Sequence, residues 1–397
     1  MNILNVLVVA TKAPWPPIDG GRLLLRNMLE GLAAAGHRAT LVAPVDPARF
    51  DLAAVGEALA GCCRPRLVAA APSPPVAALL RAGRDRSPLS IARHTLPAVR
   101  REVEQALREE RFDLIHAEQL QAFPQAVAAG APVVLRAQNV ESGLWREAAD
   151  RSGGWRRALL GIEARRLARW EGEAVGRAAA TLALTAGDAA RLRALAGHRE
   201  GGAVSVSVVR AMFPELPVAA GDPLPGDPAV VVLGSQGWLP NEDSVSWFLA
   251  AAWPAVTAAL PGAVLHLFGA APAGPLPDRV SVHPAPRDSA EAFRPGAVLA
   301  VPLRIASGVR MKVLEAWARG VPVVGTPEAL AGLEVEDGRE ALVAAGAAGF
   351  ADALARLHRE PGLAARLVEE GRRARRERHD PPRVTADLLA AYARVII

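Results

Sequence analysis

Short runs of apolar residues alternate along the chain with longer stretches that have helical periodicity. Residues 3–10, 297–302 and 321–325 are nearly all apolar, which is typical of parallel strands covered on both faces by helices. Apolar positions recur at helical spacing over residues 22–35, and Gly36 is suited to end that helix. The pattern therefore predicts an α/β fold built from strand–helix–strand units.

One stretch near the middle interrupts this alternation. Residues 213–228, with the sequence FPELPVAAGDPLPGDP, are rich in proline and glycine and contain few side chains that can form a core. A chain of 397 residues is also too long for one core of ordinary size. We therefore predict one Rossmann-like domain over residues 1–213 and a second over residues 228–380. Residues 381–397 are expected to form a final amphipathic helix.

The segment between the strands 297–302 and 321–325 contains the strongest candidates for ligand-binding residues. A helix is predicted from about residue 309 to 319, so its first backbone N–H groups form a seat for an anion. Arg310 and Lys312 add two cations there, and Glu315, one turn later, could accept hydrogen bonds from ribose hydroxyls. The pattern predicts a nucleotide-diphosphate site, and the alternative is an ordinary unit with a solvated basic helix start.

Net charge, cysteine content and hydropathy limit the ligands and cellular locations that the sequence predicts. The chain has 46 lysine and arginine residues and 41 acidic residues. The resulting net charge of +5 is too small to indicate a nucleic-acid-binding protein. Cys62 and Cys63 are adjacent and lack the spacing of a zinc site, which fits a reducing cytoplasm. Residues 244–277 contain no charged side chain, but prolines and glycines interrupt them. We interpret this segment as a buried helix followed by the strand VLHLF, and a membrane span as the alternative.

The run SGVRMKVLEAWARGVPVVGT, residues 307–326, resembles the donor-binding segment of GT-B glycosyltransferases, in particular those of family four. Other stretches over nearly the whole chain agree with the resemblance. It implies two Rossmann-like domains that face each other across a cleft, with residues 381–397 packing back on the first domain. It also implies a retaining, metal-independent glycosyltransferase of polysaccharide biosynthesis that needs no cofactor. Such an enzyme moves a sugar from a nucleotide-diphosphate donor to a glycan, a lipid-linked or a small-molecule acceptor.

The resemblance assigns the donor contacts residue by residue. The family's ribose-binding glutamate corresponds to Glu315, and the loop before it, which holds the diphosphate and the sugar, corresponds to Ser307, Gly308 and Val309. The family usually has another glutamate eight positions earlier, where this chain has Ser307, and this departure bears on the identity of the sugar. The remaining donor candidates, from glycine-rich loops and from basic or aromatic positions, are Gly20, Gly21, Gly234, Ser235, Trp238, Arg287 and Arg304.

Catalysis and acceptor binding are assigned in the same way. Arg310 and Lys312, with the N–H groups after Gly308, are expected to stabilise the departing diphosphate. His116, predicted at the carboxyl end of its strand, corresponds to a functional histidine close to the transferred sugar. The run QNVES, residues 138–142, resembles the family's H-N-x-x-S, with Gln138 in the place of the histidine. Its neighbourhood supplies the candidate acceptor contacts, which otherwise cap a helix: Asn139, Glu141 and Trp145.

Residues 155–178 form a predicted basic amphipathic helix. It is either a domain helix with a solvated face or a patch against anionic lipid head groups, so the protein is expected in the cytoplasm or on the inner face of the membrane. Two other functions stay open: a sugar-nucleotide epimerase of the same fold, and a binding protein of that fold without catalysis. A dinucleotide-dependent oxidoreductase is disfavoured because the opening loop lacks G-x-G-x-x-G.

Overall fold

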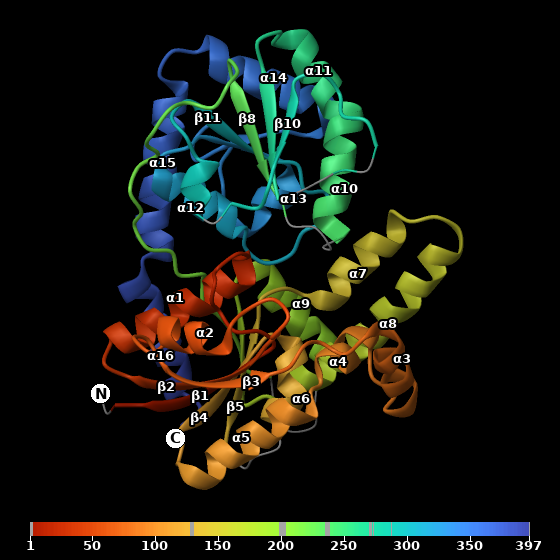
Figure 1. Ribbon diagram of the computed structural model, residues 1–397, viewed down its shortest axis with the longest axis vertical. Coiled ribbons are helices and arrows are strands. Elements are labelled where there is room, and N and C mark those ends of the chain that lie inside the picture. Colours follow the sequence, from red (N-terminus) through yellow and green to blue (C-terminus); the bar gives the residue numbers. More distant parts are fainter. Residues whose placement is uncertain are drawn as a thin grey trace. The chain divides into compact units, whose positions relative to one another are not determined.

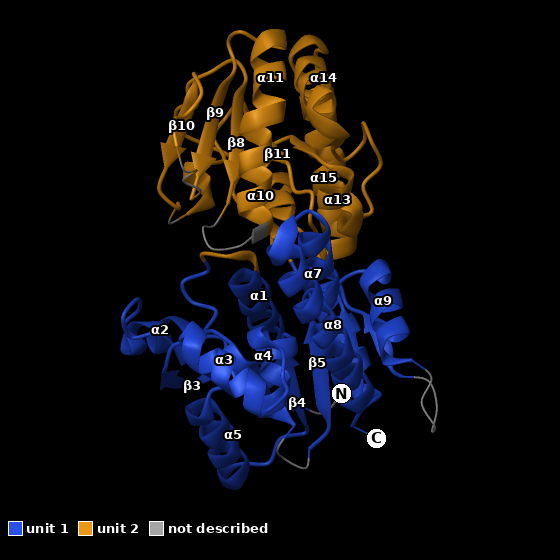
Figure 2. Ribbon diagram, turned by 90° about the vertical axis from the view of Figure 1, so that its right-hand side faces the viewer, with its two compact units in different colours: residues 1–17, 21–212, 381–397 blue, residues 18–20, 213–380 orange. Residues whose placement is uncertain are grey.

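The computed structural model describes residues 3–127, 131–197, 204–234, 239–269, 272, 274–286 and 288–396. The chain divides into two compact units, which Figure 2 shows in different colours. Unit 1 comprises Met1–Pro17, Gly21–Met212 and Pro381–Ile397, and unit 2 comprises Ile18–Gly20 and Phe213–Asp380. The proline-rich connection 213–227 groups with unit 2 and leads into its first strand.

The described part of unit 1 contains a seven-stranded parallel sheet in the order β3-β2-β1-β4-β5-β6-β7 (Figure 1). All residues of its central strands β1, β4 and β5 are buried. The apolar sequence of β1 predicts this, whereas β4 and β5 also contain the buried polar residues His116, Glu118 and Arg136. The strands are β1 (Asn5–Ala10), β2 (Arg38–Val45), β3 (Arg64–Ala69), β4 (Leu114–Glu118), β5 (Val133–Ala137), β6 (Ala180–Ala183) and β7 (Val206–Val208).

Helices cover both faces of this sheet. One hydrophobic core contains side chains of α1, α2 and the last helix, α16, and the other contains side chains of α5, α6, α8 and α9. The helices of unit 1 are α1 (Gly20–Ala34), α2 (Leu52–Leu59), α3 (Pro75–Arg84), α4 (Leu89–His94), α5 (Pro97–Glu109), α6 (Phe123–Ala126), α7 (Glu141–Asp150), α8 (Gly154–Arg177), α9 (Ala186–Ala196) and α16 (Pro381–Ala393).

The last helix, α16, is part of the core of unit 1. Val384, Leu388 and Tyr392 are buried in the same cluster as strand β1 and helix α1. Gly31 of α1 permits this approach, because a Cβ there would lie 2.5 Å from the Thr385 hydroxyl oxygen. Unit 1 is therefore completed by residues from both ends of the described chain.

The described part of unit 2 contains a six-stranded parallel sheet in the order β10-β9-β8-β11-β12-β13. Its strands are β8 (Ala229–Leu233), β9 (Val264–Phe268), β10 (Val280–His283), β11 (Ala297–Val301), β12 (Val323–Gly325) and β13 (Leu342–Val343). Its helices are α10 (Leu239–Trp247), α11 (Trp253–Ala259), α12 (Met311–Arg319), α13 (Pro327–Leu330), α14 (Gly346–Arg359) and α15 (Leu363–His379).

The uncharged segment 244–277 adopts the predicted buried structure. The side chains of Trp253 and Val256 in α11 are buried, and VLHLF forms strand β9, so the prediction is confirmed. Within the described ranges, no helix combines the length and the apolar character that crossing a membrane requires.

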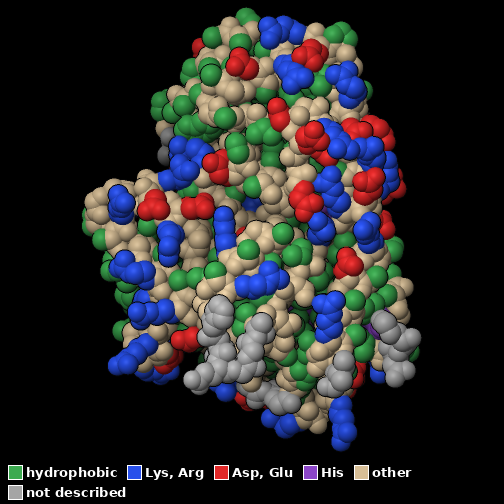
Figure 3. All heavy atoms as spheres, turned by 180° about the vertical axis from the view of Figure 1, so that it is seen from behind, with side chains coloured by type: hydrophobic (Ala, Val, Ile, Leu, Met, Phe, Trp, Pro, Cys, Tyr) green, Lys and Arg blue, Asp and Glu red, His purple; other side chains and the backbone are tan. Residues whose placement is uncertain are grey.

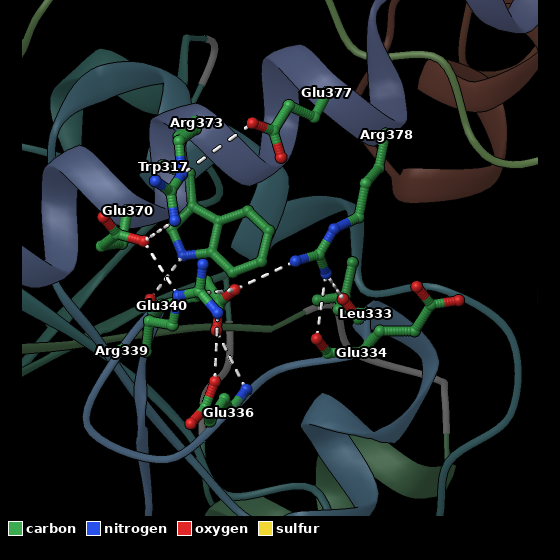
Figure 4. Close-up of polar contacts among 10 residues, drawn as sticks. All are labelled: Trp317, Leu333, Glu334, Glu336, Arg339, Glu340, Glu370, Arg373, Glu377 and Arg378. Atoms are coloured by element: carbon green, nitrogen blue, oxygen red, sulfur yellow. Dashed lines mark hydrogen bonds and ion pairs between the residues drawn. The ribbon is translucent and has the colours of Figure 1, made fainter.

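A polar network fixes α12 against α15 and the loop before β13 (Figure 4). The Trp317 indole N–H donates to the Glu340 carbonyl over 3.0 Å, and the buried Glu340 carboxylate accepts from Arg378 over 3.0 Å. Gly371 of α15 leaves room for the indole, since a Cβ there would lie 2.4 Å from Trp317 Cδ1. The carboxyl half of α12 is thus anchored to α15 and to the loop before β13.

Candidate functional site

Helix α12 begins beside the carboxyl ends of two neighbouring strands of unit 2. Strand β11 ends at Val301, and the chain reaches α12 through a loop in which Gly308 has φ +71°. Arg310 is the N-cap residue and provides no side-chain cap for the first turn. The helix begins at Met311 and ends at Arg319, followed by Gly320 in the left-handed conformation. This is the crevice at which open α/β sheets bind ligands.

Both predicted cations of this helix start are held in place. The buried Arg310 guanidinium donates to the Ser307 carbonyl within the loop. The Lys312 ammonium donates to the carbonyl of Leu233, the last residue of β8, which places it next to Gly234. Burial and the nearby charge of Arg310 lower the pKa of Lys312 to about 7. The structure therefore brings the two cations, the loop and Gly234 together.

Glu315 lies one turn further along α12. Its carboxylate accepts a hydrogen bond from the Ser289 hydroxyl, and burial raises its pKa. Arg319, one turn later, donates to the same hydroxyl over 3.0 Å and to Asp288 over 2.7 Å. Sequence reasoning missed Ser289 and Arg319, although the spacing of four residues places Arg319 and Glu315 on one helix face.

Arg304 already has a partner of opposite charge. We expected it to help neutralise a diphosphate, but its guanidinium forms two bonds with the Asp243 carboxylate, of 3.0 and 2.6 Å. It also lies 5.3 Å from the ring centre of Trp247. A carboxylate already provides the counter-charge, so Arg310 and Lys312 remain as the cations of the candidate site.

The other donor candidates are distributed as follows. A Cβ on Gly20 would lie 3.3 Å from Met311 Cγ, so this glycine allows the opening loop to approach the start of α12. The Gly21 carbonyl accepts a hydrogen bond of 3.5 Å from the Gln138 amide in unit 1. Val309 is buried in the loop before α12. Ser235, Trp238 and Arg287 lie outside the described residues.

His116 lies in the predicted strand, two residues before its carboxyl end. The strand continues to Glu118, and the His116 side chain is fully buried, with Nε2 3.0 Å from Glu118 Oε2 and Nδ1 2.7 Å from the Tyr392 hydroxyl. Burial lowers its pKa, so the ring is neutral near pH 7. Both ring nitrogens therefore have partners inside the core of unit 1. The catalytic role of His116 stays a prediction.

Polar side chains that we had not selected occupy the strand ends instead. Gln138 Nε2 lies 2.7 Å from Glu118 Oε1, and Gln119 Nε2 lies 2.7 Å from Gln138 Oε1. The Thr11 hydroxyl, just after β1, donates to Gln119 Oε1 over 2.7 Å. With His116 and Tyr392 these residues form one continuous series of hydrogen bonds, which we call the Thr11–Tyr392 chain. The signal for Thr11 and Gln119 was available, because both follow the carboxyl ends of predicted strands.

The candidate acceptor residues surround the start of α7. Glu171 of α8 accepts hydrogen bonds from the backbone N–H groups of Glu141 and Ser142 and therefore caps this helix. Burial and the charge of Glu171 raise the pKa of Glu141 to about 7, although hydrogen bonds with Asn139 and Gln121 oppose this. Asn139 and Glu141 thus lie together, and the half-buried Trp145 packs against the core of unit 1. Within the described ranges, no group of three or more His, Cys, Asp or Glu side chains is arranged to hold a metal ion.

Comparison with known proteins places this geometry in context. The family model described as glycosyl transferases group 1 matches residues 227–360, and the glycosyl transferase 4-like domain model matches residues 19–209. No match was found among curated protein sequences.

Solved structures resemble the chain over nearly its whole length. HepE of Anabaena in complex with UDP-glucose is 14% identical, with a TM-score of 0.62 over 98% of this chain and 99% of that one. Sucrose-phosphate synthase of Thermosynechococcus elongatus is 17% identical, with a TM-score of 0.72 over 99% of each chain. The calicheamicin glycosyltransferase CalG4 is 18% identical, with a TM-score of 0.52 over the full length of both chains. At these identities the likeness concerns the fold.

Proposed function

The chain belongs to the group 1 glycosyltransferases and has the GT-B fold, and from this premise we propose that it transfers a hexose from a nucleoside-diphosphate donor to a hydroxyl group of an acceptor. We further propose that transfer retains the anomeric configuration and that the acceptor is a glycan, a lipid-linked sugar or a small molecule. UDP-glucose is the donor to examine first, because a solved structure of the same fold binds it.

The observation that carries the proposal is the pair of cations at the start of α12. When the bond between the sugar C1 and the diphosphate oxygen breaks, negative charge develops on the leaving group while the acceptor oxygen bonds to C1. The acceptor proton then passes to the departing phosphate oxygen. Arg310 and Lys312 are fixed beside a helix N-terminus and stabilise this charge without reorganising. We propose that they perform the role that a metal ion has in other transferases, so that no cofactor is required.

The remaining contacts follow from the same placement. Glu315 lies one turn after Met311 on α12 and is proposed to accept hydrogen bonds from the ribose hydroxyls. Its half-buried carboxylate already accepts from Ser289, which fixes its orientation. The acceptor, or the sugar being transferred, is proposed to contact the polar strand ends of unit 1, where Gln138, Asn139 and Glu141 lie.

Arg310→Ala provides the direct test. Loss of one preorganised contact to the developing charge typically lowers kcat by about 100- to 1,000-fold. We expect that loss in UDP release from UDP-glucose with acceptor present, without a change in melting temperature beyond a few degrees. Arg359→Ala, at the exposed end of α14, is the matched control. Turnover by Arg310→Ala close to that of the wild type would contradict the proposed role.

The product identifies the class of reaction. Proton NMR of the reaction mixture would show a new glycosidic anomeric signal if the protein is a transferase, and its coupling constant would report retention. An altered UDP-sugar formed without acceptor would indicate an epimerase. Calorimetric binding of UDP-glucose without any turnover would indicate a binding protein of this fold.

A surface of unit 1 supports the proposal of peripheral membrane contact from the cytoplasmic side. Helices α3 and α8 adjoin, since Arg166 donates to the carbonyls of Ala82 and Ser87. Between them lies a cavity of about 540 Å³ whose lining includes Arg86, Arg169 and Trp170. Apolar side chains are exposed on both helices, namely Val76, Leu79, Leu80, Trp155, Leu159 and Ile162, and Figure 3 shows basic side chains along its left-hand edge, where α8 lies. Exposed apolar groups flanked by arginine fit an anionic lipid surface.

Vesicle sedimentation tests this surface. The protein is expected to sediment with vesicles that contain anionic phosphatidylglycerol, less with pure phosphatidylcholine, and less again at high salt. Replacing both Trp155 and Leu80 by serine should weaken binding several-fold without affecting the fold, because both side chains are more than 70% exposed. Equal binding by this variant would exclude the α3–α8 surface as the contact.

A further inference from the structure

The Thr11–Tyr392 chain runs through unit 1 from the last helix to the ends of β1, β4 and β5. Each of its six side chains is buried or nearly so, and consecutive members are joined by bonds of 2.7 to 3.0 Å. Neither the family resemblance nor the proposed mechanism uses the members Tyr392, Glu118 and Thr11. A buried polar group without a hydrogen-bond partner costs free energy of folding, so the donors and acceptors of this network have a defined arrangement.

One charge determines that arrangement. Burial opposes ionisation of Glu118, but the charge of Arg136 and hydrogen bonds from His116 and Gln138 hold its pKa below the usual value. An ionised carboxylate only accepts, so His116 Nε2 and Gln138 Nε2 must both carry donated protons. The neutral ring of His116 then accepts at Nδ1, and the Tyr392 hydroxyl donates to it.

The same argument continues in the other direction. Because Gln138 donates its amide nitrogen to Glu118, its amide oxygen accepts from Gln119. The side-chain oxygen of Gln119 then accepts from the Thr11 hydroxyl, whose proton therefore points toward Gln119. An amide can otherwise adopt either of two orientations, which differ by exchange of donor and acceptor. The Glu118 charge, together with the longer bond from Gln138 to the Gly21 carbonyl, therefore selects one of two arrangements at two successive glutamines.

Two observations indicate that this arrangement is imposed by the structure. Gln119 has φ +75° and ψ 154°, a backbone conformation that costs a non-glycine residue about 1–3 kcal/mol and persists mainly at functional sites. Arg136 lies within 3.6 Å of Glu118 and is 1% exposed, and no described residue accepts a hydrogen bond from its guanidinium nitrogens. The guanidinium thus supplies charge to Glu118 without competing for the acceptor positions that His116 and Gln138 occupy.

We propose that Tyr392, His116 and Glu118 are positioning residues, which orient Gln138, Gln119 and Thr11 so that the strand ends present a fixed hydrogen-bonding pattern to a sugar. The Thr11 proton points inward, so its oxygen offers lone pairs to a hydroxyl group of the ligand. Residues of the last helix thereby influence the recognition of a sugar that they do not touch. The identity of the ligand as a sugar rests on the proposed function, whereas the orientation of the chain does not.

Tyrosine NMR tests the chain without any need for catalysis. Tyr392 is the single tyrosine of the sequence, so protein labelled with [13Cζ]tyrosine gives one resonance that reports the hydrogen bond to His116. Glu118→Gln preserves shape but introduces donors, and it should shift this resonance, as should Gln138→Leu. Glu163→Gln is the matched control, because Glu163 is a buried carboxylate that accepts a backbone N–H elsewhere in unit 1. An unshifted resonance in both Glu118→Gln and Gln138→Leu would overturn the proposal.

Kinetics then test the influence on the sugar. Tyr392→Phe removes one oxygen atom and should lower kcat/KM for the acceptor about tenfold, with the KM for UDP-glucose unchanged, and Glu118→Gln should lower it further. If Tyr392→Phe lowers only the melting temperature, the residue is structural and the positioning role fails. If the wild type transfers no sugar while the NMR coupling is present, the proposed function and the sugar recognition fail together, and the orientation of the chain stands.

Discussion

We predict that donor binding is sensitive to pH, because Lys312 is a proposed contact of the diphosphate and has a lowered pKa. Its pKa is lowered to about 7 because burial and Arg310 both disfavour the charged form. An ordinary lysine titrates near 10.4 and keeps its charge at neutrality, whereas this displaced group changes its charge there. A diphosphate bound at the start of α12 favours the ammonium and raises its pKa again. Binding therefore takes up a proton.

The magnitude follows from the fraction of protein that is protonated. With a pKa of about 7, roughly 90% of the free protein carries the charge at pH 6 and roughly 10% carries it at pH 8. The dissociation constant of UDP-glucose should thus rise about tenfold between these pH values, which is about 1.4 kcal/mol. UDP-glucose is preferred to UDP, because a terminal phosphate titrates near pH 6 and would obscure the effect.

Calorimetry in buffers with different ionisation enthalpies measures the proton directly. At pH 8 we expect uptake of nearly one proton per UDP-glucose bound, and at pH 6 almost none. Lys312→Arg keeps the charge at every pH and should bind independently of pH, whereas Lys312→Met should bind weakly throughout. The reasoning is refuted if Lys312→Arg shows the same pH dependence as the wild type, or if no proton is taken up at pH 8.

The remaining predictions concern stability. Gly371→Ala should lower the free energy of unfolding by about 2 kcal/mol in urea denaturation, since its Cβ would overlap the Trp317 indole, whereas Gly61→Ala, with no atom within 4 Å, should change it little. The folded-state pKa of Glu141 is raised from 4.5 to about 7, so the folded state binds the extra proton in that window and the contribution of this group to stability falls as pH rises through it. Glu141→Gln removes that loss and should be more stable than the wild type at pH 8, by at most about 3 kcal/mol, with the difference disappearing near pH 4. A difference that grows toward acid pH would contradict the raised pKa.

The segment around α12 was predictable because its signals are local. An apolar strand, Gly308 and Gly320 at positions of positive φ, and two cations at the helix start all lie within about one turn of the residues that they explain. The predicted and observed starts of the helix differ by two residues, which is the usual uncertainty at a helix end. Here the chemistry of the candidate site and the local structure arise from the same few residues.

The partners of His116 and Arg304 could not be predicted, because distant residues supply them. His116 and Glu118 are polar members of a buried strand, whose end the sequence placed correctly at Glu118. Tyr392, which satisfies the ring of His116, is 276 residues away in the sequence. Arg304 likewise found its partner in Asp243, 61 residues earlier. Neither periodicity nor a sequence motif can predict such contacts, because they depend on which elements the tertiary fold brings together.

The placement of α16 has a consequence for how the protein forms during translation. Strand β1 is made long before α16, and the core around it stays incomplete until Val384, Leu388 and Tyr392 have left the ribosome. Unit 2, which consists of Phe213–Asp380 and the earlier residues Ile18–Gly20, can finish folding before then. The apolar surface of unit 1 that α16 covers therefore stays exposed until α16 has been made. A stop codon placed after residue 380 would yield a polypeptide in which unit 2 is folded and unit 1 aggregates.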